Sequence, residues 1–150
     1  MDFLFTAEAG LAGLFLASFL SATLLPGGSE VVLAGLLLAH PEQAPAALLL
    51  ATVGNTAGGM VTYALGRLIP ERVMRSGIHA DGAGDTAIRH IETLRRHGAP
   101  ALLLAWAPVI GDALCAAAGW LRLPPLACTL WMALGKGARY LVVASGVGML

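Results

Sequence analysis

The segment Pro26-Gly27-Gly28-Ser29-Glu30 breaks an apolar stretch that runs from Gly10 to Leu25 and resumes from Val31 to Ala39. As a helix, the resumed piece would rise only about 14 Å, roughly half of a bilayer's hydrocarbon core. Broken backbone is tolerated at membrane depth only where protein or a wet cavity satisfies its polar groups. We therefore expect a re-entrant helical hairpin, with one kinked helix from Leu4 to His40 as the alternative.

A second break of the same kind divides the apolar stretch from Ala99 to Trp120, at Pro108-Val109-Ile110-Gly111-Asp112. Two unbroken apolar blocks, 45–68 and 125–150, are long enough to cross a hydrocarbon core, which takes about 20 residues. The sequence therefore predicts an all-α membrane protein, with a single domain over residues 1–150.

Composition supports this fold class. Hydrophobic residues make up 57% of the chain and charged residues 12%, whereas an ordinary soluble domain carries about 25% charged residues. The formal net charge is zero, which gives no indication of a nucleic-acid partner. Cys115 and Cys128 lack the spacing of a metal or redox motif, so we expect no metal and no cofactor.

The basic residues set the expected topology. No Lys or Arg precedes Arg67, and six arginines flank or fill the polar stretch between the two halves. The positive-inside rule places this stretch, about 70–98, in the cytoplasm. Ile88, Ile91 and Leu94 lie three apart within it, as in an amphipathic helix on the anionic inner leaflet.

The two halves of the chain share landmarks that indicate an internal repeat. Repeat one covers about 1–68 and repeat two about 99–150, each a hairpin followed by a spanning helix, in opposite orientations. Inverted repeats with interrupted segments are typical of secondary transporters. The matched landmarks are Pro26/Glu30 with Pro108/Asp112, Pro41 with Pro124, and Gly54-Asn55 with Gly135-Lys136, at offsets of 82, 83 and 81 residues.

Four charged residues fall inside the apolar segments: Glu30 and Asp112 at the hairpin tips, and Lys136 and Arg139 in the last block. Each charge at the centre of a spanning helix costs about 2.5–3.5 kcal/mol. They form either two buried ion pairs that fix the packing, or a polar cavity. In a cavity the carboxylates would carry protons or ions, and the cations, with Asn55 beside them, would bind an anionic headgroup.

Small residues have two expected roles. Gly54, Gly58 and Gly59 allow close packing of the helix over 45–68. The hairpin breaks depend on residues that interrupt a helix, namely Pro26, Gly27, Gly28, Pro108 and Gly111.

Three sequence runs together resemble the DedA membrane proteins, also called SNARE-associated or VTT-domain proteins, and most of all their short YqaA branch. These runs are Pro26-Gly27-Gly28-Ser29-Glu30, the stretch from Gly54-Asn55-Thr56-Ala57-Gly58-Gly59 to Gly66-Arg67, and Pro108-Val109-Ile110-Gly111-Asp112 with Ala118-Gly119-Trp120. The resemblance implies a multi-pass protein of the bacterial inner membrane that flips undecaprenyl phosphate or a phospholipid, coupled to protons. Glu30 matches the family's acidic position, but Ala105 and Gly111 stand where typical members carry arginine.

The expected function is therefore transport of an anionic lipid, a polyprenyl phosphate or a phospholipid, whose headgroup is the expected partner. The glycine faces and the family are consistent with a homodimer. A non-catalytic assembly subunit is the alternative. A lipid-phosphate enzyme is less favoured because no Ser-His-Asp arrangement or paired-histidine metal spacing is present, so we expect the protein not to be an enzyme.

Overall fold

The computed structural model describes residues 7–23, 28–73, 76, 84–107 and 109–148, and all the regular structure in these residues is helical. This agrees with the predicted all-α class. Of the predicted hairpin breaks, Pro26, Gly27 and Pro108 lie outside the described residues.

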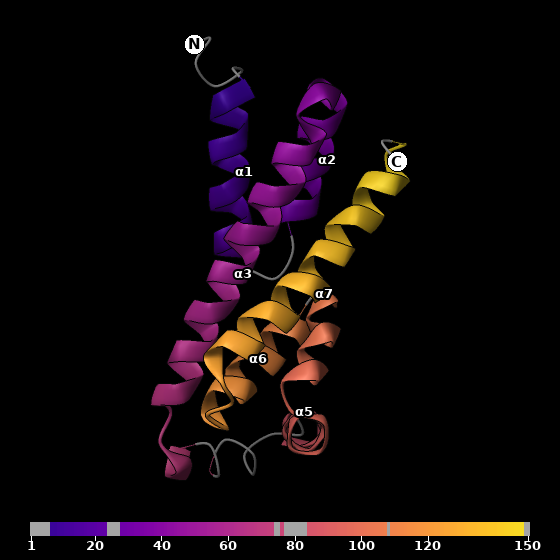
Figure 1. Ribbon diagram of the computed structural model, residues 1–150. Helices are drawn as coiled ribbons and strands as arrows, with labels where there is room; N and C mark the ends of the chain where they lie inside the picture. The colour runs from indigo at the N-terminus through magenta and orange to yellow at the C-terminus, as the bar shows by residue number, and fades with distance from the viewer. Residues whose placement is uncertain (1–6, 24–27, 74–75, 77–83, 108, 149–150) are drawn as a thin grey trace.

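The first half contains two short helices and one long helix (Figure 1). Helix α1 (Ala7–Ser21) runs down one side of the molecule, and α2 (Ser29–Ala39) returns beside it. A short 3-10 turn, η2 (Pro41–Gln43), leads into α3 (Ala44–Leu68), which runs the length of the molecule.

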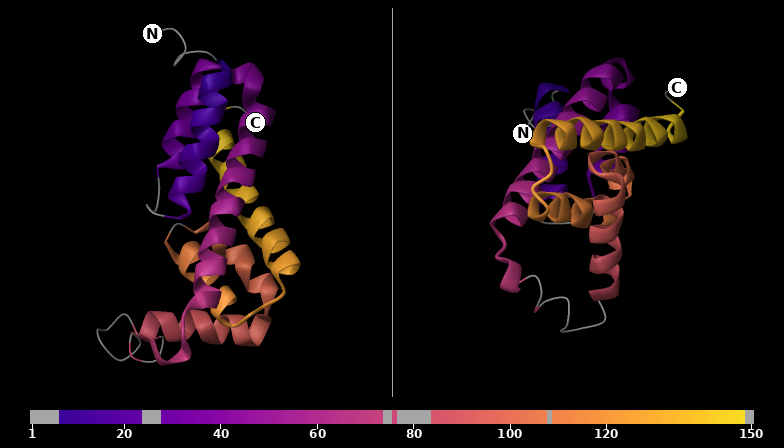
Figure 2. Two further views of the ribbon diagram at one scale, coloured as in Figure 1. Left: turned by 90° about the vertical axis from the view of Figure 1, so that its left-hand side faces the viewer. Right: turned by 60° about the horizontal axis from the view of Figure 1, so that its bottom comes forward.

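The second half begins at the opposite end of the molecule from the start of α1. There α5 (Gly84–His97) lies across the lower ends of the other helices (Figure 2, left). The chain continues through a 3-10 helix, η3 (Ala99–Trp106), and α6 (Ile110–Trp120), and α7 (Pro125–Gly146) then runs back beside α3.

The two halves have matching element boundaries. Helices α2 and α6 both contain 11 residues, and α6 begins 81 residues after α2. Helix α7 also begins 81 residues after α3. The residues before α2 and α6, Gly28 and Val109, both have positive φ, 108° and 67°. The halves differ in their first arms, because α1 is an α-helix whereas η3 is a 3-10 helix.

The surface is unlike that of a soluble protein, and a charged residue is buried in the interior. Leu126 on α7 is 86% exposed and Val31 on α2 is 76% exposed, whereas Lys136 is 1% exposed. Water would penalise so much exposed apolar surface, whereas hydrocarbon would not. The burial pattern therefore supports a membrane protein.

One helical segment among the described residues, Pro41–Leu68, is both long and apolar enough to cross a membrane, and α1 and α2 are shorter apolar helices. Helix α7 has 22 residues, a length of about 33 Å at 1.5 Å per residue. Its crossing of the membrane stays a prediction.

Glycines on α3 allow α1 to approach closely. A Cβ at Gly54 would lie 2.7 Å from the Phe15 carbonyl oxygen, and one at Gly58 would lie 2.5 Å from the Phe19 carbonyl oxygen. Any larger residue would push the two helices apart, which is the small-residue packing of membrane helices.

Helix α5 packs differently from the expectation. Ile91 and Leu94 are buried in a cluster with residues of η3 and α6, and only Ile88 of the three is exposed. Two of the three apolar residues that define this face therefore pack on protein, and Ile88 stays exposed.

Candidate functional site

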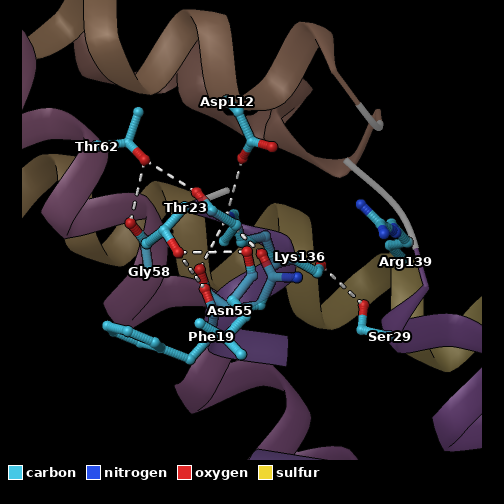
Figure 3. Close-up of polar contacts among 12 residues, drawn as sticks. Phe19, Thr23, Ser29, Asn55, Gly58, Thr62, Asp112, Lys136 and Arg139 are labelled. Carbon is cyan, nitrogen blue, oxygen red and sulfur yellow. Dashed lines mark hydrogen bonds and ion pairs between the residues drawn. The ribbon is translucent and has the colours of Figure 1, made fainter. Parts of the chain in front are cut away.

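The four embedded charges form two separate ion pairs on α7. Lys136 Nζ lies 3.8 Å from Asp112 Oδ1, and the Arg139 guanidinium pairs with the Glu30 carboxylate. Lys136 and Arg139 are one turn apart near the middle of the helix (Figure 3). The structure thus brings together residues from α2, α6 and α7 that the sequence singled out.

Lys136 is enclosed by protein. Its ammonium donates to the backbone oxygen of Asn55 at 2.8 Å and to Asn55 Oδ1 at 2.5 Å, in addition to the ion pair with Asp112. Gly59 makes room for it, because a Cβ there would lie 2.9 Å from Nζ. An ammonium has three protons to donate, and two of them are directed at Asn55. Asp112, at 3.8 Å, supplies the counter-charge beyond hydrogen-bond distance.

Asn55 extends this group of polar residues toward the first hairpin. Its Nδ2 donates to the Tyr140 hydroxyl at 2.7 Å, and that hydroxyl lies 2.9 Å from Ser29 Oγ. Ser21 Oγ donates to Ser29 Oγ at 3.3 Å. A buried polar chain therefore runs from Lys136 to the point where α1 ends and α2 begins.

The sequence analysis missed Ser21, Ser29 and Tyr140. Tyr140 lies four residues after Lys136 and therefore on the same face of α7. Ser29 directly precedes Glu30 in the first break. These two sequence positions could have indicated Tyr140 and Ser29 as neighbours of the charged residues. Nothing in the sequence singles out Ser21.

The polar chain separates two apolar cores. Met132, one turn before Lys136, belongs to the lower core with residues of α5, η3 and α6. Tyr140, one turn after Lys136, belongs to the upper core with residues of α1, α2 and α3. The candidate site is therefore a polar layer at mid-height in the molecule.

Arg139 is more accessible than Lys136. Its side chain is 13% exposed and that of its partner Glu30 is 26% exposed. Glu30 Oε2 also accepts the Gly28 N–H at 3.2 Å, in the first turn of α2. A carboxylate is stabilised at a helix N-terminus by the unpaired N–H groups there.

The two acids occupy different positions in matching helices. Glu30 is the second residue of α2, whereas Asp112 is the third residue of α6. One residue turns an α-helix by about 100°. The acids therefore point in different directions relative to their own helices, which explains why each one meets a different cation of α7.

Metal binding has no support in this layer. Among the residues that the structure describes, no three His, Cys, Asp or Glu side chains are grouped so that they could hold a metal ion.

Comparison with known proteins places these features in a family of membrane proteins. Residues 25–148 match the model of the VTT domain. The chain therefore belongs to the VTT-domain family, and the predicted relationship to the DedA proteins is confirmed.

Two relatives cover most of the chain. The chain is 44% identical over 136 residues to the inner membrane protein YqaA of Escherichia coli, covering 90% of this chain and 89% of that protein. It is 41% identical over 142 residues to an uncharacterized protein of Haemophilus influenzae, covering 89% of this chain and 84% of that protein. No solved structure gives a significant match. The Escherichia coli relative confirms the predicted inner-membrane location.

Proposed function

We propose that the protein transports an anionic lipid across the inner membrane, and that Arg139 binds the lipid headgroup. The observation that carries this proposal is the Arg139–Glu30 pair, which is partly exposed within a molecule whose outer surface is apolar. A guanidinium binds phosphate through a planar fork of donors. A polar layer of this kind would let a charged headgroup cross the membrane without entering hydrocarbon.

The proposed architecture is an inverted repeat of two re-entrant hairpins. The common offset of 81 residues between α2 and α6, and between α3 and α7, supports it. By this offset Asn55 is equivalent to Lys136, and the two side chains contact each other. When two repeats are related by a twofold axis, a residue that contacts the equivalent residue of the other repeat must lie next to that axis. The polar layer would thus lie at the repeat interface, where secondary transporters bind their substrates.

The proposed mechanism is an exchange of partners at Arg139. When a lipid phosphate binds the guanidinium, Glu30 loses its counter-ion. A carboxylate left without a cation in a poorly hydrated site binds a proton. Release of the lipid would return Glu30 to Arg139 and free the proton, which would couple lipid movement to proton movement.

An apolar groove provides space for the lipid tail. A groove of about 470 Å³ lies between α5 and α6, and its lining includes Ile91, Val109, Ile110 and Ala113. Ala113 directly follows Asp112 in the sequence of α6. Hydrocarbon is the only solvent that would fill such a groove in a bilayer, which supports a lipid as the substrate. The mechanism requires no metal, cofactor or covalent step, as expected for a transporter that is not an enzyme.

A non-catalytic structural role is the second candidate, and the Lys136 environment favours it. Lys136 is almost fully buried and its donors are directed at Asn55 and Asp112. Such a pair fixes the packing of α3, α6 and α7 without any ligand.

Reconstituted vesicles test the two candidates. We expect movement of a labelled anionic phospholipid between leaflets to be lost in Arg139→Ala and in Glu30→Gln. Arg96→Ala, which removes an exposed positive charge from α5, is the matched control and should retain movement. Unchanged movement in both test variants, with the protein folded, would contradict the proposal. Release of inorganic phosphate would instead indicate an enzyme.

A further inference from the structure

A second charged site lies away from the polar layer, at the end of the molecule where α3 ends and α5 lies across the other helices (Figure 2, left). A pocket of about 520 Å³ is formed there by the end of α3, by α5 and by the link between α6 and α7. This volume is typical of small-molecule sites. Its lining includes Arg67, Glu71, Arg95, Trp120 and Arg122.

The three arginines of this pocket come from three separate segments, so their convergence is a property of the fold. Together with Glu71 they give the lining a formal net charge of +2. Within the described part of the chain, no carboxylate forms an ion pair with any of the three arginines. Apart from the Arg67 donor that bonds the Tyr63 hydroxyl, their forked donors therefore remain available for an anion.

Arg122 occupies a backbone position that favours glycine. Its φ is 56°, in the left-handed region. The Arg122 N–H donates to the Gly119 oxygen at 2.9 Å, and the Leu123 N–H donates to the Ala118 oxygen at 3.1 Å. These two bonds are the Schellman motif that ends many helices, and its left-handed residue is usually glycine. An arginine at this position strains the backbone, which points to a role for its side chain.

Arg67 is connected through hydrogen bonds to the link between α6 and α7. Its Nη1 donates to the Tyr63 hydroxyl at 3.3 Å, and that hydroxyl donates to the Leu123 oxygen at 2.5 Å. Tyr63 is buried. It joins the end of α3 to the residue next to Arg122, and both arginines line the same pocket.

We propose that this pocket binds a phosphate group through Arg67, Arg95 and Arg122. Its place at one end of the helices, with Trp120 in its lining, is typical of the membrane–water interface. Lipid phosphates lie at that depth, and free phosphate offers the same oxygens. The site is separate from Arg139, and its binding does not depend on the transport mechanism.

The experiment compares two substitutions that remove one positive charge each from the full-length protein in detergent. Arg122→Gly removes a pocket arginine and supplies the residue that the backbone favours, so the melting temperature should stay equal or rise. Arg96→Ala removes a neighbouring surface arginine that does not line the pocket. The probes are inorganic phosphate, titrated by calorimetry against chloride at equal ionic strength, and mixed micelles of phosphatidic acid, measured against phosphatidylcholine.

We expect Arg122→Gly to weaken phosphate binding by about tenfold, the size of one charge-assisted hydrogen bond. Arg96→Ala should change binding by less than about twofold. Arg95→Ala is a second pocket variant and should weaken binding as Arg122→Gly does. Binding of phosphatidic acid alone would identify a lipid site, and binding of both probes a general phosphate site. Equal losses in the pocket and surface variants, or no binding of either probe, would overturn the proposal.

Discussion

The two ion pairs of α7 lie one turn apart and differ in the burial of their cations. Lys136 is 1% exposed and is held by both oxygens of Asn55 as well as by Asp112. Arg139 and Glu30 are both partly exposed. The ammonium of the first pair, here called the sealed pair, cannot lose its partner without being left buried and unpaired. The partly exposed guanidinium of the second pair, here called the open pair, can. The two acids do not differ in this way, because Asp112 is 31% exposed and Glu30 26%. Stability should therefore depend on the first pair and ligand binding on the second.

The largest expected effect is on the sealed pair. Asp112→Asn would leave the Lys136 ammonium buried without a counter-charge. We expect the free energy of unfolding to fall by about 3 kcal/mol, the lower end for a broken buried pair because Asp112 itself is 31% exposed. Thermal unfolding in detergent measures this loss.

The control for this prediction removes both charges. Asp112→Asn combined with Lys136→Met should recover much of the lost stability, because no unpaired charge remains. If the double variant were no more stable than Asp112→Asn, the ammonium would not be the cause of the loss.

A smaller effect is expected from the Tyr140 hydroxyl, which joins Asn55 to Ser29. Tyr140→Phe would leave Asn55 Nδ2 without its acceptor and would remove a partner of Ser29 Oγ. The loss should be about 1–2 kcal/mol. Ser21→Ala, at the end of the polar chain, removes one longer bond of 3.3 Å and should cost less. The reverse order would show that the chain does not support the sealed pair.

Gly59→Ala tests how tightly Lys136 is enclosed. The added Cβ would lie 2.9 Å from Nζ, so the ammonium must shift away from Asn55. Because the end of a lysine side chain is flexible, we expect a loss of only about 1 kcal/mol. Gly13→Ala on α1 is the control, since a Cβ there meets nothing within 4 Å. Equal melting temperatures for the two variants would mean that the ammonium has free space.

The residues of both ion pairs could be predicted from the sequence, because charged residues and helix breaks stand out in an apolar chain. Glu30, Asp112, Lys136 and Arg139 were all recognised in this way. Which acid meets which cation could not be predicted. That pairing depends on where α2 and α6 begin, and a difference of one residue turns the side chain by about 100°.

Contacts between segments that are far apart in the sequence were harder to predict. Tyr140 and Ser29 are 111 residues apart, and neither residue type is unusual in a membrane helix. The burial of Ile91 and Leu94 was missed because an amphipathic pattern is the same whether the apolar face meets lipid or protein. Sequence periodicity shows which face of a helix is apolar, but not whether protein or lipid covers that face.

The smallest effect on stability is expected at the Arg139–Glu30 pair, where stability and lipid movement should respond most differently to one substitution. Glu30→Gln removes the partner of Arg139, but both side chains are partly exposed, so the loss should be below about 1 kcal/mol. The same substitution should abolish lipid movement, because glutamine cannot exchange a proton. Measuring the melting temperature and lipid movement on one preparation of Glu30→Gln and one of Asp112→Asn separates the two roles. If Glu30→Gln lowered stability as much as Asp112→Asn, both pairs would be structural, and the difference in exposure along α7 would have no functional meaning.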